Sequence, residues 1–343
     1  MQRLRIAQIS PLYESVPPTG YGGTERVVSW LTEALVAAGH ELVLFASADS
    51  QTKAELVACA PRALRLDPSG PDPIAAHLVM LEEAFSRAHE FDVIHAHVDY
   101  LAFPFARRVR CPVVTTLHGR LDLPSLVPVF REYPEQRVIS ISDHQRGPLP
   151  DARWQATIHH GLPPDLYRFR EGGEGYLAFL GRISPEKRVD RAIEIAVRAG
   201  RPLRIAAKID AADRAYYERE IRPLFDHPLV EYVGELCDGE KNDFLGNAAA
   251  VLFPIDWPEP FGLIMIEALA CGTPVIAWPH GSVPEVLEDG ISGYLCSEID
   301  EAVRAVARIG ALDRRRCRAE FERRFTAERM ARDYAALYEG LLA

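Results

Sequence analysis

Two glutamates, Glu259 and Glu267, are the residues of this chain best suited to chemistry. They lie in the stretch W-P-E-P-F-G-L-I-M-I-E-A-L-A-C-G-T-P-V-I-A, residues 257–277. Its prolines disfavour helix before Gly262 and Gly272 ends it, which predicts a helix of about ten residues between two strands. This helix is apolar on nearly every face, so we expect it to be buried. A carboxylate inside it, Glu267, then needs a hydrogen-bond partner.

The other glutamate, Glu259, precedes the helix and would lie beside the backbone N–H groups of Phe261, Gly262 and Leu263. Unpaired N–H groups at the positive end of a helix bind anions. Carboxylates next to them are placed to accept hydrogen bonds from hydroxyl groups. An anion joined to a polyol is a nucleotide sugar, with its diphosphate, ribose and hexose. The structural alternative is a glutamate that reaches solvent from a buried helix and a second one in an ordinary loop.

A second group of charged residues lies near the start of the chain's second half, in G-R-I-S-P-E-K-R-V-D. A strand is expected at 176–180, followed by a helix from Ser184, its N-cap, through Ala199. Arg182 precedes that helix and Lys187 falls in its first turns. Cations there oppose the helix dipole by roughly 0.3–1 kcal/mol, so an anion is expected at this position. The alternative is two merely exposed basic side chains.

The elements that must position these residues form a repeating strand–helix pattern. In the second half we expect strands at 203–207, 230–233, 250–254, 274–278 and 294–296. In the first half a strand at 4–9, a helix at 24–38 and a strand at 41–46 form a βαβ unit, followed by strands at 91–95, 112–117, 137–141 and 155–159. This alternation predicts parallel sheets.

The loop after the first strand, 10–22, is much longer than the usual two to six residues. Ligands bind at the carboxyl ends of parallel strands, and Gly22 and Gly23 allow a close backbone approach there. The later strands of the first half are each followed by a polar residue: His97, His118, Ser142 or His160. We expect these to outline one edge of a crevice, although a single histidine is more often structural.

Several of these segments together resemble the retaining glycosyltransferases of family 4, which have the GT-B fold. The shared segments are E-P-F-G-L-x3-E-A-x-A-x-G-x-P-V, G-R-x3-E-K, T-T-L-H-G and G-G-x-E. The resemblance implies an α/β protein with two Rossmann-like, doubly wound parallel-sheet domains facing each other across a cleft. The expected domains are 1–160, an acceptor-side domain to which the C-terminal helix 326–343 crosses back, and 161–325, the nucleotide-sugar-binding domain.

The resemblance also implies the roles of individual residues. Arg182 and Lys187 would grip the donor diphosphate, Glu259 the transferred sugar and Glu267 the ribose, with His118 near the sugar. The expected catalytic residues are His118, Arg182, Lys187 and Glu259. The expected donor-binding residues are Gly22, Gly23, Arg182, Lys187, Val233, Gly234, Glu259, Phe261, Gly262, Leu263 and Glu267. The chain departs from the family at Ala207-Lys208-Ile209-Asp210, where many members have G-x-G, so contacts to the base are not predicted.

The activity implied is transfer of a hexosyl unit from a nucleoside-diphosphate sugar, UDP-linked by preference, to an acceptor hydroxyl with retention of configuration. No D-x-D motif or ligand cluster is present, so we expect neither a metal nor another cofactor. The alternatives are another GT-B enzyme, such as a UDP-sugar 2-epimerase or a phosphorylase, and a non-catalytic nucleotide-binding Rossmann protein. A dinucleotide site is disfavoured because no G-x-G-x-x-G follows the first strand.

Composition limits the partners. With 39 basic and 49 acidic residues the formal net charge is −10, which argues against nucleic acid and against strong membrane association. Six arginines between 314 and 324 alternate with acidic residues and indicate a solvated helical face. Six scattered cysteines and an N-terminus without an apolar core favour a cytoplasmic protein. The expected acceptor is a small molecule, glycan or natural product, and the expected state a monomer or weak dimer.

Overall fold

The computed structural model describes residues 2–20, 22–173 and 175–342, which form two compact units. The first unit comprises Met1–Pro163 with Thr326–Ala343, and the second comprises Pro164–Phe325. The division expected from the sequence, at residue 160, lies close to this one. Tyr21, in the long loop after the first strand, and Glu174, near the domain junction, lie outside the described residues.

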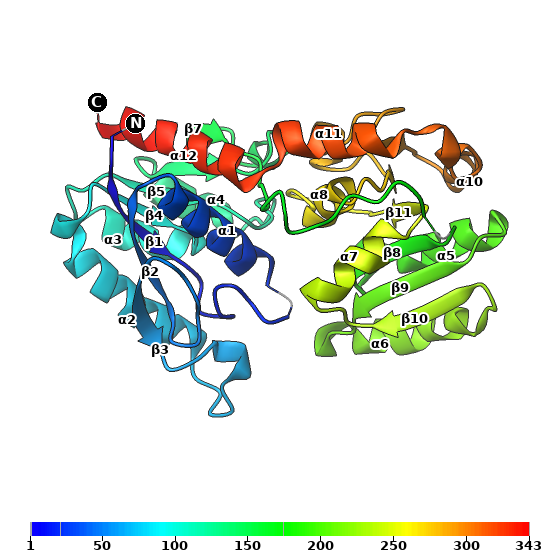
Figure 1. Cartoon of the computed structure of the whole chain (residues 1–343). Coiled ribbons are helices and arrows are strands. Elements are labelled where there is room, and N and C mark those ends of the chain that lie inside the picture. Colours follow the sequence, from blue (N-terminus) through cyan, green and yellow to red (C-terminus); the bar gives the residue numbers. More distant parts are fainter. Residues whose placement is uncertain (1, 21, 174, 343) are drawn as a thin grey trace. The chain divides into compact units, whose positions relative to one another are not determined.

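A seven-stranded parallel sheet forms the centre of the first unit, in the order β3-β2-β1-β4-β5-β6-β7 (Figure 1). Its inner strands are rich in Ile, Val and Ala because helices cover both faces of a parallel sheet. The strand order reverses between β1 and β4, which is where doubly wound sheets bind ligands. The strands are β1 (Arg5–Ile9), β2 (Glu41–Ser47), β3 (Glu55–Ala60), β4 (Val93–Ala96), β5 (Val113–Thr116), β6 (Arg137–Ser140) and β7 (Arg153–Thr157).

The helices of the first unit include one from the far end of the sequence. They are α1 (Gly23–Ala37), α2 (Pro73–Ser86), α3 (Phe103–Ala106), α4 (Leu126–Glu132) and α12 (Ala327–Leu342). The C-terminal helix α12 packs beside α1 (Figure 1). Its first N–H, from Ala327, donates to the carbonyl of Leu162 at 2.9 Å. The expected return of the C-terminal helix to the first domain is therefore confirmed.

The second unit has a six-stranded parallel sheet in the order β10-β9-β8-β11-β12-β13. Here the order reverses between β8 and β11. The strands are β8 (Leu177–Arg182), β9 (Leu203–Lys208), β10 (Val230–Gly234), β11 (Ala250–Phe253), β12 (Val275–Ala277) and β13 (Gly293–Leu295). All six strands expected from the sequence are present with ends shifted by a few residues.

The helices of the second unit correct one expectation. They are α5 (Val189–Arg198), α6 (Arg214–Tyr216), α7 (Asp238–Gly246), α8 (Leu263–Ala270), α9 (Val283–Val286), α10 (Ile299–Arg308) and α11 (Arg314–Arg324). The single helix expected from Ser184 to Ala199 is wrong. Residues Pro185–Lys187 form a separate 3₁₀ turn, and Arg188 has a left-handed backbone with φ of 53°. Lys187 therefore lies before α5, and its position does not imply an anion at the N-terminus of that helix.

The arginine-rich helix α11 corrects another expectation. It packs against α8, and three of its arginines turn inward rather than form a solvated face. Arg314 donates to the carbonyls of Arg170, Gly246 and Ala248, all at 2.8 Å. Arg318 likewise donates to three carbonyls, including that of Ala270 at the end of α8, at 2.7 Å. Arg324 donates to the carbonyls of residues 285 and 286. The guanidinium groups thus donate to backbone carbonyls in loops and at the C-terminal ends of α7, α8 and α9, where helical carbonyls lack an intrahelical partner.

Candidate active site

The switch point of the second unit brings two loops together. Strands β8 and β11 pair through Leu177–Ala250 and Ala178–Val251, so the loops after them, 183–188 and 254–262, begin side by side. The N–H of Asp256 donates to the carbonyl of Glu186 at 2.9 Å. Arg188 fastens the loops further, because its Nη1 donates to Asp256 Oδ2 at 2.9 Å. Side chains from both loops therefore share one edge of the sheet.

Lys187 and Glu259, one from each loop, form an ion pair between Nζ and Oε2. Trp257 Nε1 donates to the same carboxylate oxygen at 3.2 Å, and its ring lies 4.8 Å from Lys187 Nζ. Glu259 is 8% exposed. A buried carboxylate of this kind is tolerated because a cation and an N–H group both satisfy it. The ion pair therefore joins the side chains of the two loops, a contact that was not predicted from the sequence.

Arg182, the last residue of β8, lies at the same edge. Its Nη2 donates to Glu186 Oε1 at 2.7 Å, and its Nε lies 3.7 Å from Asp213 Oδ2. Burial opposes ionisation of Glu186, but hydrogen bonds from its own backbone, Ser184 and Arg182 outweigh burial and lower its pKa. The guanidinium is about a third exposed and is held by two carboxylates. It is oriented by the protein while part of it stays open to a ligand.

The N-terminus of α8 adds backbone donors next to Glu259. Gly262 precedes the helix with φ of 78°, a conformation that favours glycine. A Cβ there would lie 2.8 Å from Met265 Cε. The first N–H groups of the helix, at Leu263 and the following residues, have no preceding turn to bond to. The N-terminus of the helix therefore lies at the predicted position, beside Phe261, Gly262 and Leu263. The helix has eight residues rather than the predicted ten or so.

The segment after β12 fixes the backbone of Glu259, a contact that was not predicted from the sequence. Ser282 donates its N–H to the Glu259 carbonyl at 2.9 Å and its hydroxyl to the Phe261 carbonyl at 2.8 Å. Gly281, with φ of 62°, packs so closely that a Cβ would overlap the backbone N and O of Glu259. The signal for this contact is the glycine of P-H-G-S, four residues beyond the end of β12, which is weak in a single sequence.

Glu267 lies within α8 and is 4% exposed. Tyr167 donates its hydroxyl to Glu267 Oε1 at 3.1 Å, and Lys241 Nζ lies 3.6 Å from the same oxygen. The hydrogen-bond partner that burial requires is therefore a protein side chain. Val233 and Gly234 end β10, the edge strand, and β9 separates them from β8.

In the first unit, histidines from two strand ends join in a chain of hydrogen bonds. Gln8 of β1 contacts His97, with 2.7 Å between Oε1 and Nε2. His97 Nδ1 in turn lies 2.9 Å from Nε2 of His118, which follows β5. The ring of His118 stacks on His160 with centroids 5.3 Å apart. Three of the polar residues expected at strand ends are therefore neighbours.

A second chain of polar contacts ties this cluster to α12. His95 contacts the Tyr338 hydroxyl through Nδ1 and Thr116 Oγ1 through Nε2, both at 2.7 Å. Thr116 Oγ1 also lies 2.9 Å from the Tyr334 hydroxyl. Gln8, His95 and the two tyrosines were not predicted from the sequence to belong to this cluster.

Burial sets the protonation of these histidines. It lowers the pKa of His118 to about 3. It also lowers the pKa values of His95, His97 and His160 well below the usual value, with neighbouring histidines adding to the effect. All four rings are therefore neutral at pH 7, and each carries one N–H donor and one bare nitrogen acceptor.

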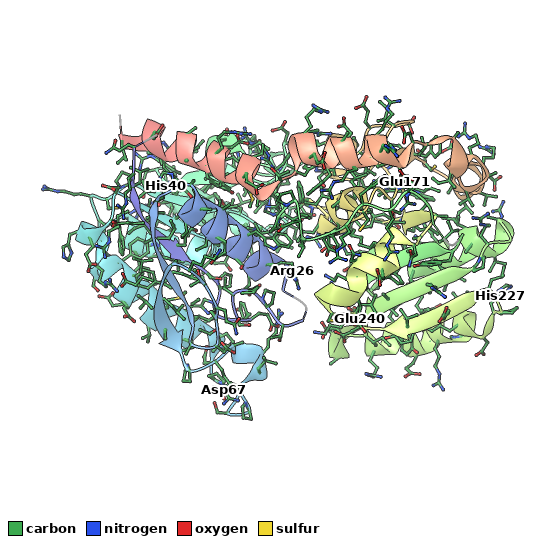
Figure 2. All side chains as sticks on the ribbon, viewed as in Figure 1. Arg26, His40, Asp67, Glu171, His227 and Glu240 are labelled. Atoms are coloured by element: carbon green, nitrogen blue, oxygen red, sulfur yellow. The ribbon has the colours of Figure 1, made fainter. Side chains whose placement is uncertain are left out.

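Gly22 and Gly23 stand where the long loop meets α1. Gly22 is extended, with φ of 169°, and a Cβ there would lie 2.9 Å from Pro18 Cβ. Arg26, which projects from the start of α1 in Figure 2, donates to the carbonyl of Gly20 at 2.8 Å. Burial raises the pKa of the neighbouring Glu25 to about 7, against opposing hydrogen bonds and the charge of Arg65. The two glycines allow the loop to pack tightly on the helix start.

Within residues 2–20, 22–173 and 175–342, no three His, Cys, Asp or Glu side chains converge to hold a metal ion. Among the same residues, no helix combines the length and apolar character needed to cross a bilayer.

Two family models match the chain one after the other. Residues 21–171 match "Glycosyltransferase Family 4" and residues 168–324 match "Glycosyl transferases group 1". The glycogen synthase of Mycobacterium tuberculosis (strain CDC 1551 / Oshkosh) is 28% identical over 93% of this chain and 90% of its own length.

Solved structures also match over nearly the whole chain. AviGT4, a glycosyltransferase involved in avilamycin A biosynthesis, has a TM-score of 0.74 and 25% identity, covering 99% of this chain and 98% of its own. Anabaena HepE, solved with UDP-glucose, has a TM-score of 0.74 and 18% identity, covering 98% of this chain and 100% of its own. These structures share the two-domain α/β fold, and the expected GT-B fold is confirmed.

Proposed function

Because the chain belongs to the family 4 glycosyltransferases, enzymes that transfer a glycosyl unit from a nucleotide sugar, we propose a finer description of its reaction. The enzyme moves a hexosyl unit from a nucleoside-diphosphate sugar to an acceptor hydroxyl. It retains the anomeric configuration and requires no metal ion.

One observation carries this proposal: Arg182, Lys187 and Glu259 share the β8–β11 edge beside the N-terminus of α8. Cations and backbone N–H groups suit a diphosphate, and a carboxylate beside them suits sugar hydroxyls. In the transition state, positive charge develops on the sugar and negative charge on the departing diphosphate. Arg182, Lys187 and the helix end would stabilise the leaving charge, the role a divalent metal has in other enzymes.

The remaining residues have supporting roles in the proposed reaction. Glu259 binds hydroxyls of the transferred sugar. Glu267 binds the ribose through Oε2, the carboxylate oxygen that Tyr167 and Lys241 do not contact. His118, neutral because burial lowers its pKa to about 3, contacts the sugar as a hydrogen-bonding group rather than as a cation. The departing phosphate oxygen takes the proton of the acceptor hydroxyl.

The choice of substrates rests on relatives. HepE was solved with UDP-glucose and shares the fold, and the similar M. tuberculosis enzyme is named a glycogen synthase. UDP-glucose is therefore the first donor to test, with ADP-glucose and GDP-mannose as comparisons. Glycogen is the first acceptor, followed by small glycosides.

The test combines binding with product analysis. A bound donor raises the melting temperature by mass action, so thermal shifts with each nucleotide sugar rank the donors. The preferred donor is then incubated with acceptors, and NMR reads the anomeric configuration of the product. We expect an α-linked product from an α-linked donor, without added phosphate and in the presence of EDTA. An inverted product, or a rate restored only by magnesium or manganese, would contradict the retaining or metal-free part of the proposal. A phosphate-dependent product would indicate a phosphorylase.

A further inference from the structure

The contacts of His118 leave one of its ring nitrogens available. Its Nε2 lies 2.9 Å from His97 Nδ1, and one face of the ring stacks on His160. In the part of the chain that the structure describes, Nδ1 of His118 has no hydrogen-bond partner, and it is not buried. Whether this nitrogen donates or accepts decides which substrate group it can hold.

The protonation of Nδ1 depends on the two residues behind it. A neutral imidazole has one N–H, so each ring in a hydrogen-bonded chain passes its polarity to the next. The amide oxygen of Gln8 faces His97 Nε2 at 2.7 Å, and an oxygen can only accept. His97 must then carry its hydrogen on Nε2, which leaves its Nδ1 bare. A bare Nδ1 on His97 requires the hydrogen of His118 to be on Nε2.

We propose that Gln8 and His97 are positioning residues that fix His118 in the Nε2–H tautomer, so that its Nδ1 accepts a hydrogen bond from a substrate hydroxyl. We call this hydrogen-bonded series of Gln8, His97 and His118 the relay, and it is present in the folded protein without substrate. The identity of its partner as a sugar hydroxyl rests on the proposed function.

Packing makes the relay rigid. His97 is 2% exposed and Gln8 is fully buried. The His95 ring packs on His97 with centroids 4.0 Å apart, and α12 holds His95 through Tyr338. Because burial lowers the pKa values of all these histidines, a second proton does not disturb the order of donors and acceptors at neutral pH. A substrate that lacks a hydroxyl at this point would leave the nitrogen without a donor, so the relay contributes to specificity.

The relay is tested directly by ¹⁵N NMR of the full chain with labelled histidine, using His118→Gln to assign the signals. We expect the wild-type His118 signals of a protonated Nε2 and a bare Nδ1. Gln8→Leu removes the acceptor and should shift His118 toward a mixture of tautomers, whereas Gln8→Glu, which keeps an oxygen acceptor, should preserve the wild-type pattern. Tyr334→Phe is the matched control, because it removes a buried hydroxyl that contacts Thr116 and leaves Gln8, His97 and His118 in place. A protonated Nδ1 in the wild type would overturn the proposal without the need for any variant.

The hydroxyl partner is tested by kinetics with UDP-glucose and its singly deoxygenated and fluorinated analogues, with glycogen as acceptor. At one ring position, loss of the hydroxyl should raise the wild-type KM about three- to tenfold, the range for one neutral hydrogen bond. The same change should have no further effect in His118→Gln. If every analogue affects wild type and variant equally, the assignment of the hydroxyl to His118 is wrong. If the wild type transfers no sugar at all, both the proposed function and the assignment of the hydroxyl are wrong. The NMR result still tests the tautomer of His118 independently.

Discussion

Lys187 and Glu259 contact each other through Nζ and Oε2, although the proposed reaction requires them to bind different parts of the donor. The free site therefore neutralises its own charges. A diphosphate that attracts Lys187 would weaken this pair and leave the carboxylate of Glu259 available to the sugar. Binding of the two halves of the donor is in this way linked through one ion pair.

Lys187→Ala should lower turnover by about 10²-fold or more, because groups that stabilise charge in the transition state typically contribute 10² to 10³ in rate. Steady-state rates with saturating donor measure the effect. Arg198→Ala removes a cation of the same unit whose partners, Glu194 and Asp300, are at the surface, and it should leave turnover unchanged. Equal rates for Lys187→Ala and wild type would contradict the proposed diphosphate site.

The sequence predicted the fold well because both sheets depend on local patterns. Apolar runs bounded by glycine and proline located every strand of the second unit. The strand β3 and helix α2 were not predicted, since β3 is a half-exposed edge strand and its alternation is weak. The break at Arg188 was missed for a similar reason. A left-handed arginine depends on Asp190 and Asp256, its carboxylate partners, and the second of these is distant in sequence.

Candidate site residues could be identified from the sequence only where they lie in a short motif or in a motif shared with the family. Glu259, Glu267, Arg182 and Lys187 became candidates in this way. Contacts made across the sheet, such as Gln8 to His97, join residues far apart in the chain, and no spacing rule connects them.

Gly281→Ala should reduce both stability and turnover, because the added Cβ would overlap the backbone of Glu259 and displace it. Gly290→Ala is the matched control. It has a similar backbone, with φ of 73°, and a Cβ there meets nothing within 4 Å. Both variants bear the cost of a left-handed alanine, about 1 kcal/mol. Denaturant unfolding and turnover, measured on both, should show a larger loss for Gly281→Ala. Equal losses would show that the contact with Glu259 has no effect.

Glu267→Gln distinguishes ribose binding from a purely structural role. If the carboxylate bonds the ribose, loss of its charge removes roughly 1.5–3 kcal/mol, and the donor KM should rise about ten- to hundredfold. Turnover should fall less, because ribose contacts act equally in ground and transition states. Tyr167→Phe removes the structural hydrogen bond to the same oxygen and keeps the charge. It should lower the melting temperature and change KM little. An unchanged KM with a lower melting temperature in Glu267→Gln would favour the structural role.

The buried histidines predict a loss of stability in acid. The pKa values of His95, His97 and His160 are lowered in the folded protein, so below pH 6.5 the unfolded chain takes up protons that the folded state does not. Each such histidine lowers the unfolding free energy by about 1.4 kcal/mol per pH unit in that range. Their stabilising effect is complete above pH 6.5 and is lost as the pH falls.

Two buried carboxyls act in the opposite direction, and they supply the sharpest test. Burial raises the folded pKa of Glu25 to about 7 and that of Asp99 to about 6, so protonation of the folded state offsets part of the acid loss. Glu25→Gln removes one group that takes up a proton in the folded state as the pH falls below 7. It should therefore be more stable than the wild type at pH 7.5 and lose stability more steeply between pH 6.5 and 5.5, by about 1.4 kcal/mol per unit. Urea unfolding at pH 7.5, 6.5 and 5.5 measures both slopes. If the unfolding free energy of variant and wild type changes equally with pH, Glu25 does not titrate in the folded protein. If the urea midpoint of the wild type does not change with pH, the buried histidines are not held neutral by the fold.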